Sequence, residues 1–483
     1  MLHTLTAKEI NEKFLKGELK ATEIVQSYLK RIEKLEPQVD AFLSLCPERA
    51  LKVAEELDQG KRKKGKLAGV PIAIKDVIHV KGQISTCGSK FLSNYVAPFD
   101  ATVTKLLEEE GAIIIGKTNC DEFAMGSSTE NSAYKKTRNP WNLKTTPGGS
   151  SGGSAAVVAA RMAPLSLGTD TGGSVRQPAS FTGTVGFKPS YGRVSRYGLV
   201  AYASSLDQIG PMTPTVEDAA LLMEVIGKHC DRDSTSLDIP GQEIVKTLAT
   251  DLKGKKIGVP WQFLEQLAPE PKAAFMEALE KLKSLGAEIV DIDLSILKYS
   301  LGTYYIVACA EASTNLARFD GIRYGVRSKQ AKTLDEVYTF SKEEGYGAEV
   351  KRRIIMGTYV LSKGYQDAYY QKAQKVRALI IEHYKRAFAK CDLVATPCSP
   401  FAAFEIGTIH DPIQIYLEDI YTISVNLAGL PGISVPAALT KTGLPMGLQL
   451  IGPHMADKLV LDAAHAFEGI SGLKNRMPEL ANV

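Results

Sequence analysis

Two short apolar runs separated by one helix-length segment restrict the fold of this chain most strongly. Residues 68–76 are apolar until they end in charge at Lys75, and residues 112–117 repeat this pattern. Wholly apolar runs of this length are typical of buried strands, and residues 101–111 between them have the spacing of an amphipathic helix. The alternation predicts an α/β sheet in which Lys75 sits at the exit of a buried strand.

Helical patterns flank these predicted strands on both sides. A capping box at Thr6 precedes apolar residues at helical intervals over 7–16 and 22–35. Residues 270–292 read as a further helix followed by a strand, and residues 345–390 look largely helical. The order of elements therefore favours a central mixed β-sheet covered by helices.

The chain shows no sign of division into several domains. Its 483 residues contain no repeat, no low-complexity tail and no Pro-rich hinge. We expect one domain over residues 1–483, with N-terminal helices over 1–40, a core over about 65–215 and a largely helical segment over about 345–390.

Composition narrows the classes of function. The formal net charge is only +4 and forms no basic block, so autonomous nucleic-acid binding is not indicated. The seven cysteines are scattered without metal-ligand spacing, which predicts reduced thiols in the cytoplasm and no metal site. No leader and no apolar stretch long enough to span a bilayer is visible, so we expect no membrane association.

The segment 147–190 carries two glycine-flanked serines, Ser150 and Ser174. Glycine permits positive φ and close backbone approach, so backbone N–H groups can converge on a developing oxyanion. The second cluster could thus hold both a nucleophile and its oxyanion hole.

A serine nucleophile needs a base, and the segment contains no histidine. A lysine can serve only when neutral, and lowering its pKa from ~10.4 to ~7 demands roughly 4–5 kcal/mol of differential interaction. Burial at a strand end can supply this, which makes Lys75 the candidate base.

Residues 147–190, together with 68–76 upstream, resemble the signature of the amidase-signature family. The resemblance implies that Lys75 deprotonates a bridging serine, Ser150, which activates the nucleophile Ser174. It further implies a cis peptide bond before Ser150, an acyl-enzyme on Ser174 and no cofactor in this chain. Backbone N–H groups would form the oxyanion hole, namely those of Thr171, Gly172, Gly173 and Ser174.

Three further stretches, 121–130, 191–210 and 318–325, resemble the glutaminase component of bacterial aspartyl/glutamyl-tRNA amidotransferases. Such components hydrolyse glutamine and pass ammonia to partner subunits B and C in a heterotrimer. The partner would bind ATP and Mg²⁺ and amidate Glu-tRNA(Gln), Asp-tRNA(Asn) or both. This chain would then contact the misacylated tRNA only through its partner.

The same resemblance assigns residues that bind substrate. Asp419 and Arg353 match the positions that bind the α-amino and α-carboxylate groups of glutamine. Tyr304 aligns with a substrate-facing tyrosine, although Tyr305 beside it competes for that assignment. Ser128 is a further candidate for substrate contact.

Several neighbouring residues are expected to be structural. Ser151 and Ser154 are expected to cap the helix suggested by residues 155–160. Asp170 and Arg176 are expected to form a buried ion pair or to bond the backbone. Cys309 reads as a small core side chain.

Two rival functions stay open. One is a stand-alone amidase that acts on other small amides. The other, of a different class, is a non-catalytic scaffold or nucleotide-binding protein.

Overall fold

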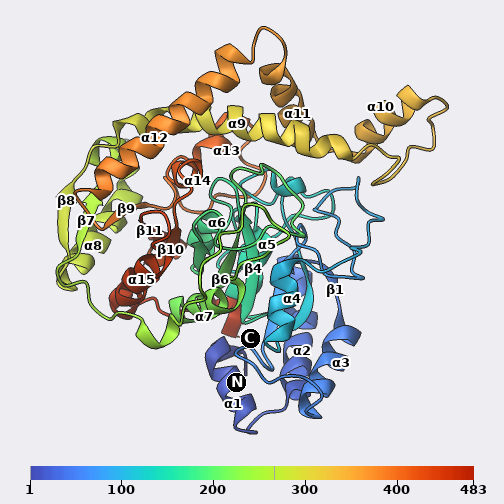
Figure 1. The fold of residues 1–483 in the computed structure, drawn as a ribbon. Coiled ribbons are helices and arrows are strands. Elements are labelled where there is room, and N and C mark those ends of the chain that lie inside the picture. The colour runs from blue at the N-terminus through green and yellow to red at the C-terminus, as the bar shows by residue number, and fades with distance from the viewer. Residues whose placement is uncertain (1, 266, 483) are drawn as a thin grey trace.

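A computed structural model describes residues 2–265 and 267–482 and contains one mixed sheet of eleven strands (Figure 1). The spatial order of the strands is β1-β3-β2-β4-β6-β5-β10-β11-β9-β7-β8. The strands are β1 (Phe42–Leu45), β2 (Pro71–Lys75), β3 (Ile113–Thr118), β4 (Leu165–Asp170), β5 (Val185–Lys188), β6 (Gln208–Thr213), β7 (Lys256–Val259), β8 (Glu288–Asp291), β9 (Leu393–Pro397), β10 (Gly432–Leu439) and β11 (Pro445–Ile451).

The N-terminal half of the sheet contains a parallel core. Strand β2 pairs in parallel with β3 on one side and with β4 on the other. Every residue of these three strands is buried. Parallel strands end at the same edge of a sheet, so β2 and β4 bring together the charged and polar residues at their carboxyl ends. Ligands of α/β sheets bind outside this edge.

Helices cover the sheet and extend beyond it. Helices α5 and α6 pack on the sheet and on each other, as do α7 and α15. The helices are α1 (Ala7–Leu15), α2 (Ala21–Val39), α3 (Pro47–Asp58), α4 (Thr102–Glu109), α5 (Gly152–Ala159), α6 (Arg176–Thr182), α7 (Val216–Ile226), α8 (Pro269–Ser284), α9 (Ser300–Asn315), α10 (Leu334–Gly345), α11 (Ala348–Leu361), α12 (Lys372–Phe388), α13 (Pro412–Leu417), α14 (Ile423–Leu427) and α15 (Asp457–Ser471). Among the described residues, no helix is both long and apolar enough to cross a membrane.

The predicted fold class is confirmed. The capping box at Thr6 opens α1, and the two apolar runs form β2 and β3 on either side of α4. The predicted helix and strand over 270–292 correspond to α8 and β8. The assignment of residues 1–40, 65–215 and 345–390 to separate regions of one domain stays a prediction.

Helices α9, α11 and α12 lie together along one end of the molecule, with α10 at a projecting tip, whereas both termini lie near α1 at the opposite end (Figure 1). The backbones of α9 and α11 approach each other closely at Gly357. A methyl group added to Gly357 would lie 1.9 Å from the Cys309 carbonyl oxygen, so only glycine fits at this crossing.

We predict that Gly357→Ala destabilises the protein by ~1–3 kcal/mol, because the added methyl group forces the two helices apart. The measurement is the free energy of unfolding from denaturant titration.

The matched control is Gly302→Ala in α9, where an added methyl group meets nothing within 4 Å. This variant should gain ~0.5–1 kcal/mol of stability from the higher helix propensity of alanine. Equal stability of the two variants would contradict the close crossing of α9 and α11.

Candidate active site

Lys75 is the last residue of β2, and its amine meets three hydroxyl groups. Its Nζ lies 2.7 Å from Ser150 Oγ, 2.9 Å from Ser151 Oγ and 2.8 Å from Thr169 Oγ1. The side chain is fully buried, and in the described part of the chain no carboxylate lies within 4.0 Å of Nζ. Burial without a counterion lowers the pKa of Lys75 to about 8, so a substantial fraction of this amine is neutral near pH 8.

The hydrogen bonds of Ser151 fix the direction in which a neutral Lys75 points its lone pair. Ser151 Oγ donates to the Thr169 carbonyl oxygen at 3.1 Å and accepts from the Thr169 N–H at 3.1 Å. Its proton is therefore committed, and it can only accept from Lys75. If Ser151 and Thr169 take the two N–H groups of a neutral amine, the lone pair is left facing the Ser150 hydroxyl. This arrangement can move a proton from Ser150 to Lys75.

The loop that carries Ser174 is organised by Asp170 at the end of β4. Asp170 accepts from the Gly173 N–H at 2.9 Å and from the Val175 N–H at 3.2 Å, and it forms a buried ion pair with Arg176 at 2.8 Å. Burial opposes ionisation of Asp170, but the Arg176 guanidinium outweighs this and lowers the pKa of the carboxyl to about 2. The expected structural ion pair is confirmed.

Ser150 and Ser174 lie on adjoining backbone segments. The Ser151 N–H donates to the Ser174 carbonyl oxygen at 3.2 Å, and the peptide bond between Gly149 and Ser150 is cis, as the resemblance implies. Lys75 and Ser150 are 0% exposed, whereas Ser174 is 7% exposed. Ser174 is therefore the member of the three that a substrate can reach.

The backbone around Ser174 offers unpaired donors. Among the residues that the structure describes, none accepts a hydrogen bond from the N–H groups of Thr171, Gly172 or Ser174, and none bonds the Ser174 hydroxyl. The Gly173 N–H differs because it already donates to Asp170. An oxyanion at this loop would therefore meet three free N–H groups of the predicted four.

The predicted helix caps are wrong. Helix α5 begins at Gly152 with Ser151 in the N-cap position, but the Ser151 hydroxyl makes no capping hydrogen bond because it contacts Lys75 and Thr169 instead. Ser154 lies inside the helix, and its hydroxyl donates to the Leu167 carbonyl oxygen at 3.0 Å. Both serines tie α5 to the neighbouring strands.

Asp419 lies beside the loop of Ser174. A methyl group added to Gly173 would lie 3.2 Å from Asp419 Oδ1. The Ser127 hydroxyl donates to Oδ2 at 2.5 Å, whereas Oδ1 is buried and has no partner in the described structure. Burial raises the pKa of Asp419 to about 7. The free oxygen leaves room for a donor such as an ammonium group.

The structure separates Tyr304 from Tyr305. A methyl group added to Gly172 would lie 2.6 Å from the Tyr304 hydroxyl oxygen, so Tyr304 covers the loop of Ser174. Tyr305 instead stacks on Tyr416 with ring centroids 4.0 Å apart. The geometry thus favours Tyr304 over Tyr305 as the residue that faces the candidate site.

Two predicted residues complete the surroundings of the site. The Ser128 backbone N–H lies beside Gly149, because a methyl group added there would be 2.6 Å from the Ser128 nitrogen. The Arg353 guanidinium lies 5.2 Å from the Tyr305 ring and is buried. The structure therefore places Ser128 beside Gly149 and Arg353 within electrostatic reach of Asp419, and their contacts with a substrate stay a prediction.

Sequence reasoning missed several contacts of this region. It did not identify Thr169 as a partner of Lys75, Ser127 as a partner of Asp419, or Glu349 as a partner of Arg353. For Thr169 a signal existed, since it precedes Asp170 at the carboxyl end of the strand parallel to β2. For Glu349 a signal also existed, because it lies four residues before Arg353 in a predicted helix, the spacing of an i,i+4 ion pair. For Ser127 no local pattern marks the contact, because its partner Asp419 lies 292 residues away in the sequence.

The stretch 318–325 lies elsewhere. Its residues Arg318, Phe319, Arg323 and Tyr324 line a cavity of about 510 Å³ together with side chains of other segments such as His79. Within residues 2–265 and 267–482, no group of three or more His, Cys, Asp or Glu side chains could hold a metal ion.

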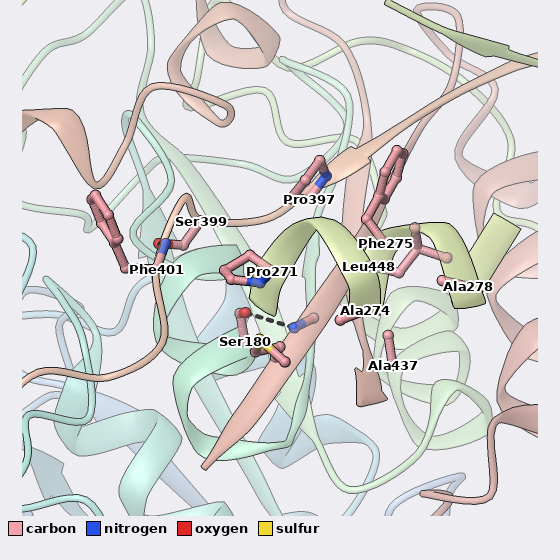
Figure 2. Close-up of a pocket in the computed structure, with 12 residues that line it drawn as sticks. Ser180, Pro271, Ala274, Phe275, Ala278, Pro397, Ser399, Phe401, Ala437 and Leu448 are labelled. Carbon is pink, nitrogen blue, oxygen red and sulfur yellow. Dashed lines mark hydrogen bonds between the residues drawn. The ribbon is translucent and has the colours of Figure 1, made fainter. Parts of the chain in front are cut away.

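A second cavity is small and apolar. Figure 2 shows it between α6, α8 and the strands β9, β10 and β11, where the Gly447 N–H donates to Ser180 Oγ at 2.8 Å. Its volume of about 20 Å³ accommodates roughly one water molecule. None of Lys75, Ser150 and Ser174 lines it.

Comparisons with known proteins agree with this geometry. A sequence model of the family described as Amidase matches residues 23–461. The A subunit of glutamyl-tRNA(Gln) amidotransferase from Protochlamydia amoebophila is 64% identical over 482 residues, which cover 99% of each chain. Its namesake from Fusobacterium nucleatum is 53% identical over 483 residues, again 99% of each chain.

A solved structure extends these matches to the fold. The crystal structure of the A subunit of glutamyl-tRNA(Gln) amidotransferase from Thermotoga maritima has a TM-score of 0.83 and 42% identity, and the match covers 100% of this chain and 98% of that one. These matches confirm the resemblance predicted from residues 68–76 and 147–190. The chain belongs to the amidase family.

Proposed function

We propose that this chain is the glutamine-hydrolysing component of a tRNA-dependent amidotransferase. The observation that carries the proposal is the buried Lys75 amine bonded to Ser150 beside the accessible Ser174. Two buried groups of opposite charge, Asp419 and Arg353, lie in the same region and complement the α-ammonium and α-carboxylate of glutamine. Few amides other than free glutamine carry both charges next to each other.

Acylation would start with neutral Lys75. Ser174 Oγ attacks the carboxamide carbon, its proton moves to Ser150, and the Ser150 proton moves to Lys75. The N–H groups of Thr171, Gly172 and Ser174 stabilise the oxyanion that forms. As the tetrahedral intermediate collapses, Ser150 donates a proton to the leaving nitrogen and regains one from Lys75. Ammonia leaves, and the γ-carbonyl stays bound to Ser174 as an ester.

Deacylation repeats the relay with water as the nucleophile. Water attacks the ester carbon and loses a proton through Ser150 to Lys75, and Ser174 then leaves with a proton returned along the same path. The product is glutamate. In both half-reactions Asp419 holds the α-ammonium, Arg353 holds the α-carboxylate, and Tyr304 and Ser128 contact the substrate.

The ammonia would serve a partner. The full-length similarity to the A subunits of glutamyl-tRNA(Gln) amidotransferases supports a cytoplasmic heterotrimer with subunits B and C. The partner would use ATP and Mg²⁺ to amidate Glu-tRNA(Gln), Asp-tRNA(Asn) or both. This chain carries a thinly spread net charge of +4, which suits a component that leaves tRNA binding to its partner.

We predict that Ser174→Ala and Lys75→Ala each lower ammonia release from glutamine by at least about 10³-fold, because each removes a member of one relay. Ammonia release is measured with the purified chain, alone and with subunits B and C. Addition of the partner and tRNA should increase the rate of the wild type.

Ser154→Ala is the matched control from the same segment, since among the described residues the Ser154 hydroxyl bonds only Thr118 and the Leu167 carbonyl. It should keep nearly the full rate. Unchanged release by Ser174→Ala would contradict the mechanism. Rapid hydrolysis of other amides without turnover of glutamine would favour the stand-alone amidase.

We predict that the pH dependence of kcat/KM contains two ionisations. Lys75 acts only when neutral, and its pKa is about 8, so the rate rises as the pH increases through about 8. Asp419 binds an ammonium only when ionised, and its pKa is about 7, so the KM for glutamine rises as the pH falls below about 7.

Glutaramate, which is glutamine without its α-amino group, separates the two ionisations. With glutaramate the rise near pH 8 should persist, whereas the dependence near pH 7 should disappear. Identical profiles for both substrates would argue against Asp419 as the group that binds the ammonium.

A further inference from the structure

The Arg353 guanidinium is enclosed by aromatic rings. Its Cζ lies 5.6 Å from the ring centroid of Tyr202, 5.2 Å from that of Tyr305 and 5.4 Å from that of Tyr416. The residue is only 3% exposed, so water does not solvate the cation freely. Rings in these positions restrict rotation of the planar group and leave its edges as the places where a ligand can bind.

Part of the hydrogen-bonding capacity of the Arg353 guanidinium is unused. Of the five N–H bonds of the guanidinium, the one on Nε donates to Glu349 Oε1 at 2.8 Å. One on Nη1 donates to the Tyr202 hydroxyl at 2.7 Å. The others, on Nη1 and Nη2, have no acceptor among the described residues. They are enough for two parallel hydrogen bonds to a carboxylate.

Glu349 is itself held in place from several directions. It precedes Arg353 by one helical turn in α11, so both side chains lie on the same face of the helix. Its Oε1 also accepts from the Tyr416 hydroxyl at 2.7 Å, and its Oε2 pairs with Arg352. Glu349 therefore gives the buried cation a fixed counterion on the side of Nε.

Asp419 and Arg353 carry opposite charges in one site, so they could pair with each other and become unavailable to a substrate. Asp419 has a buried carboxylate oxygen without a partner, and Arg353 contributes attraction to it, yet the two side chains form no ion pair with each other in the described structure. Ser127 holds Asp419 through Oδ2, and Glu349 holds Arg353 through Nε. Each charged group is thus tied on one side and open on the other.

We propose that Glu349 is a positioning residue that determines selectivity for glutamine. It compensates the Arg353 cation before the substrate binds, keeps it from pairing with Asp419, and leaves the Nη1 and Nη2 donors for the α-carboxylate of the substrate. The proposal rests on glutamine hydrolysis as the function of the chain. It adds Glu349 to the residues that select the substrate, although Glu349 does not touch the reacting atoms.

The test measures glutamine binding by calorimetry to the Ser174→Ala variant, with and without Glu349→Gln or Glu349→Ala. The α-carboxylate of glutamine should contact Arg353 only when Glu349 holds the guanidinium in place. The Kd for glutamine should therefore rise about 10- to 100-fold with Glu349→Ala. The rise should be smaller with Glu349→Gln, because the amide oxygen can still accept from Nε. Tyr202→Phe, which keeps the ring and removes one acceptor, should also raise the Kd.

Steady-state kinetics with Ser174 intact distinguish positioning from loss of structure. Glu349→Gln should raise the KM for glutamine and leave kcat within about threefold, because the relay of Lys75 and Ser150 is untouched. The substitution Glu349→Gln, made in the Ser174→Ala variant, should weaken binding of glutamine more than binding of 4-aminobutanamide, which is glutamine without its α-carboxylate.

The control is Glu382→Gln, which breaks an exposed ion pair of the same spacing with Arg386. It should change neither the KM nor the Kd for glutamine.

A Kd for glutamine that stays within twofold in both Glu349 variants overturns the proposal, as does a fall in kcat at constant KM. Equal losses of affinity for glutamine and 4-aminobutanamide would also overturn it, because a role in positioning the carboxylate contact must act on glutamine alone. Absence of glutamine binding and turnover in the chain with Glu349 intact would instead contradict the proposed function.

Discussion

The candidate site depends on one buried amine that has hydroxyl groups around it and no carboxylate in contact among the described residues. Lowering the pKa of Lys75 from 10.5 to about 8 corresponds to roughly 3 kcal/mol against the charged form. A carboxylate in contact would reverse this effect and keep the lysine protonated. The parallel pairing of β2 with β4 places Thr169 next to Lys75, and the start of α5 places Ser150 and Ser151 there. The sheet thus provides both the burial and the uncharged partners.

A second buried interaction joins this apparatus to the C-terminal half of the chain. Arg176 pairs with Asp170 and also donates to the Thr422 carbonyl, the Asn426 side chain and the Gln449 side chain. Strands β5 and β10 pair between the same two halves of the chain. The loop of Ser174 is therefore held by residues about 250 positions away as well as by its own strand, and a segment limited to 65–215 would lack these supports.

The sequence alone predicted the elements in which a reactive residue lies within a recognisable local pattern. The apolar run before Lys75 predicts both a buried strand and a lysine with a lowered pKa, and the glycines around Ser150 and Ser174 predict tight backbone loops. It did not predict β9, β10 and β11, because each of these strands contains a proline, which argues against a strand inside a sheet when the sequence is read alone. It also placed Ser151 and Ser154 as helix caps, since nothing local shows that strand residues compete for their hydroxyls.

The residues of the proton relay and most residues proposed to bind the substrate lie on different elements of the fold. This separation affects how such enzymes can diversify. The proton relay comes from β2, from the loop before α5 and from the loop after β4, whereas three of the groups proposed to recognise the substrate, Tyr304, Arg353 and Asp419, come from α9, α11 and the turn after α13. Changes in these helices alter the shape and charge of the binding region without disturbing the buried lysine. A lineage could therefore acquire a new amide substrate by altering one peripheral layer while the reaction chemistry is inherited unchanged.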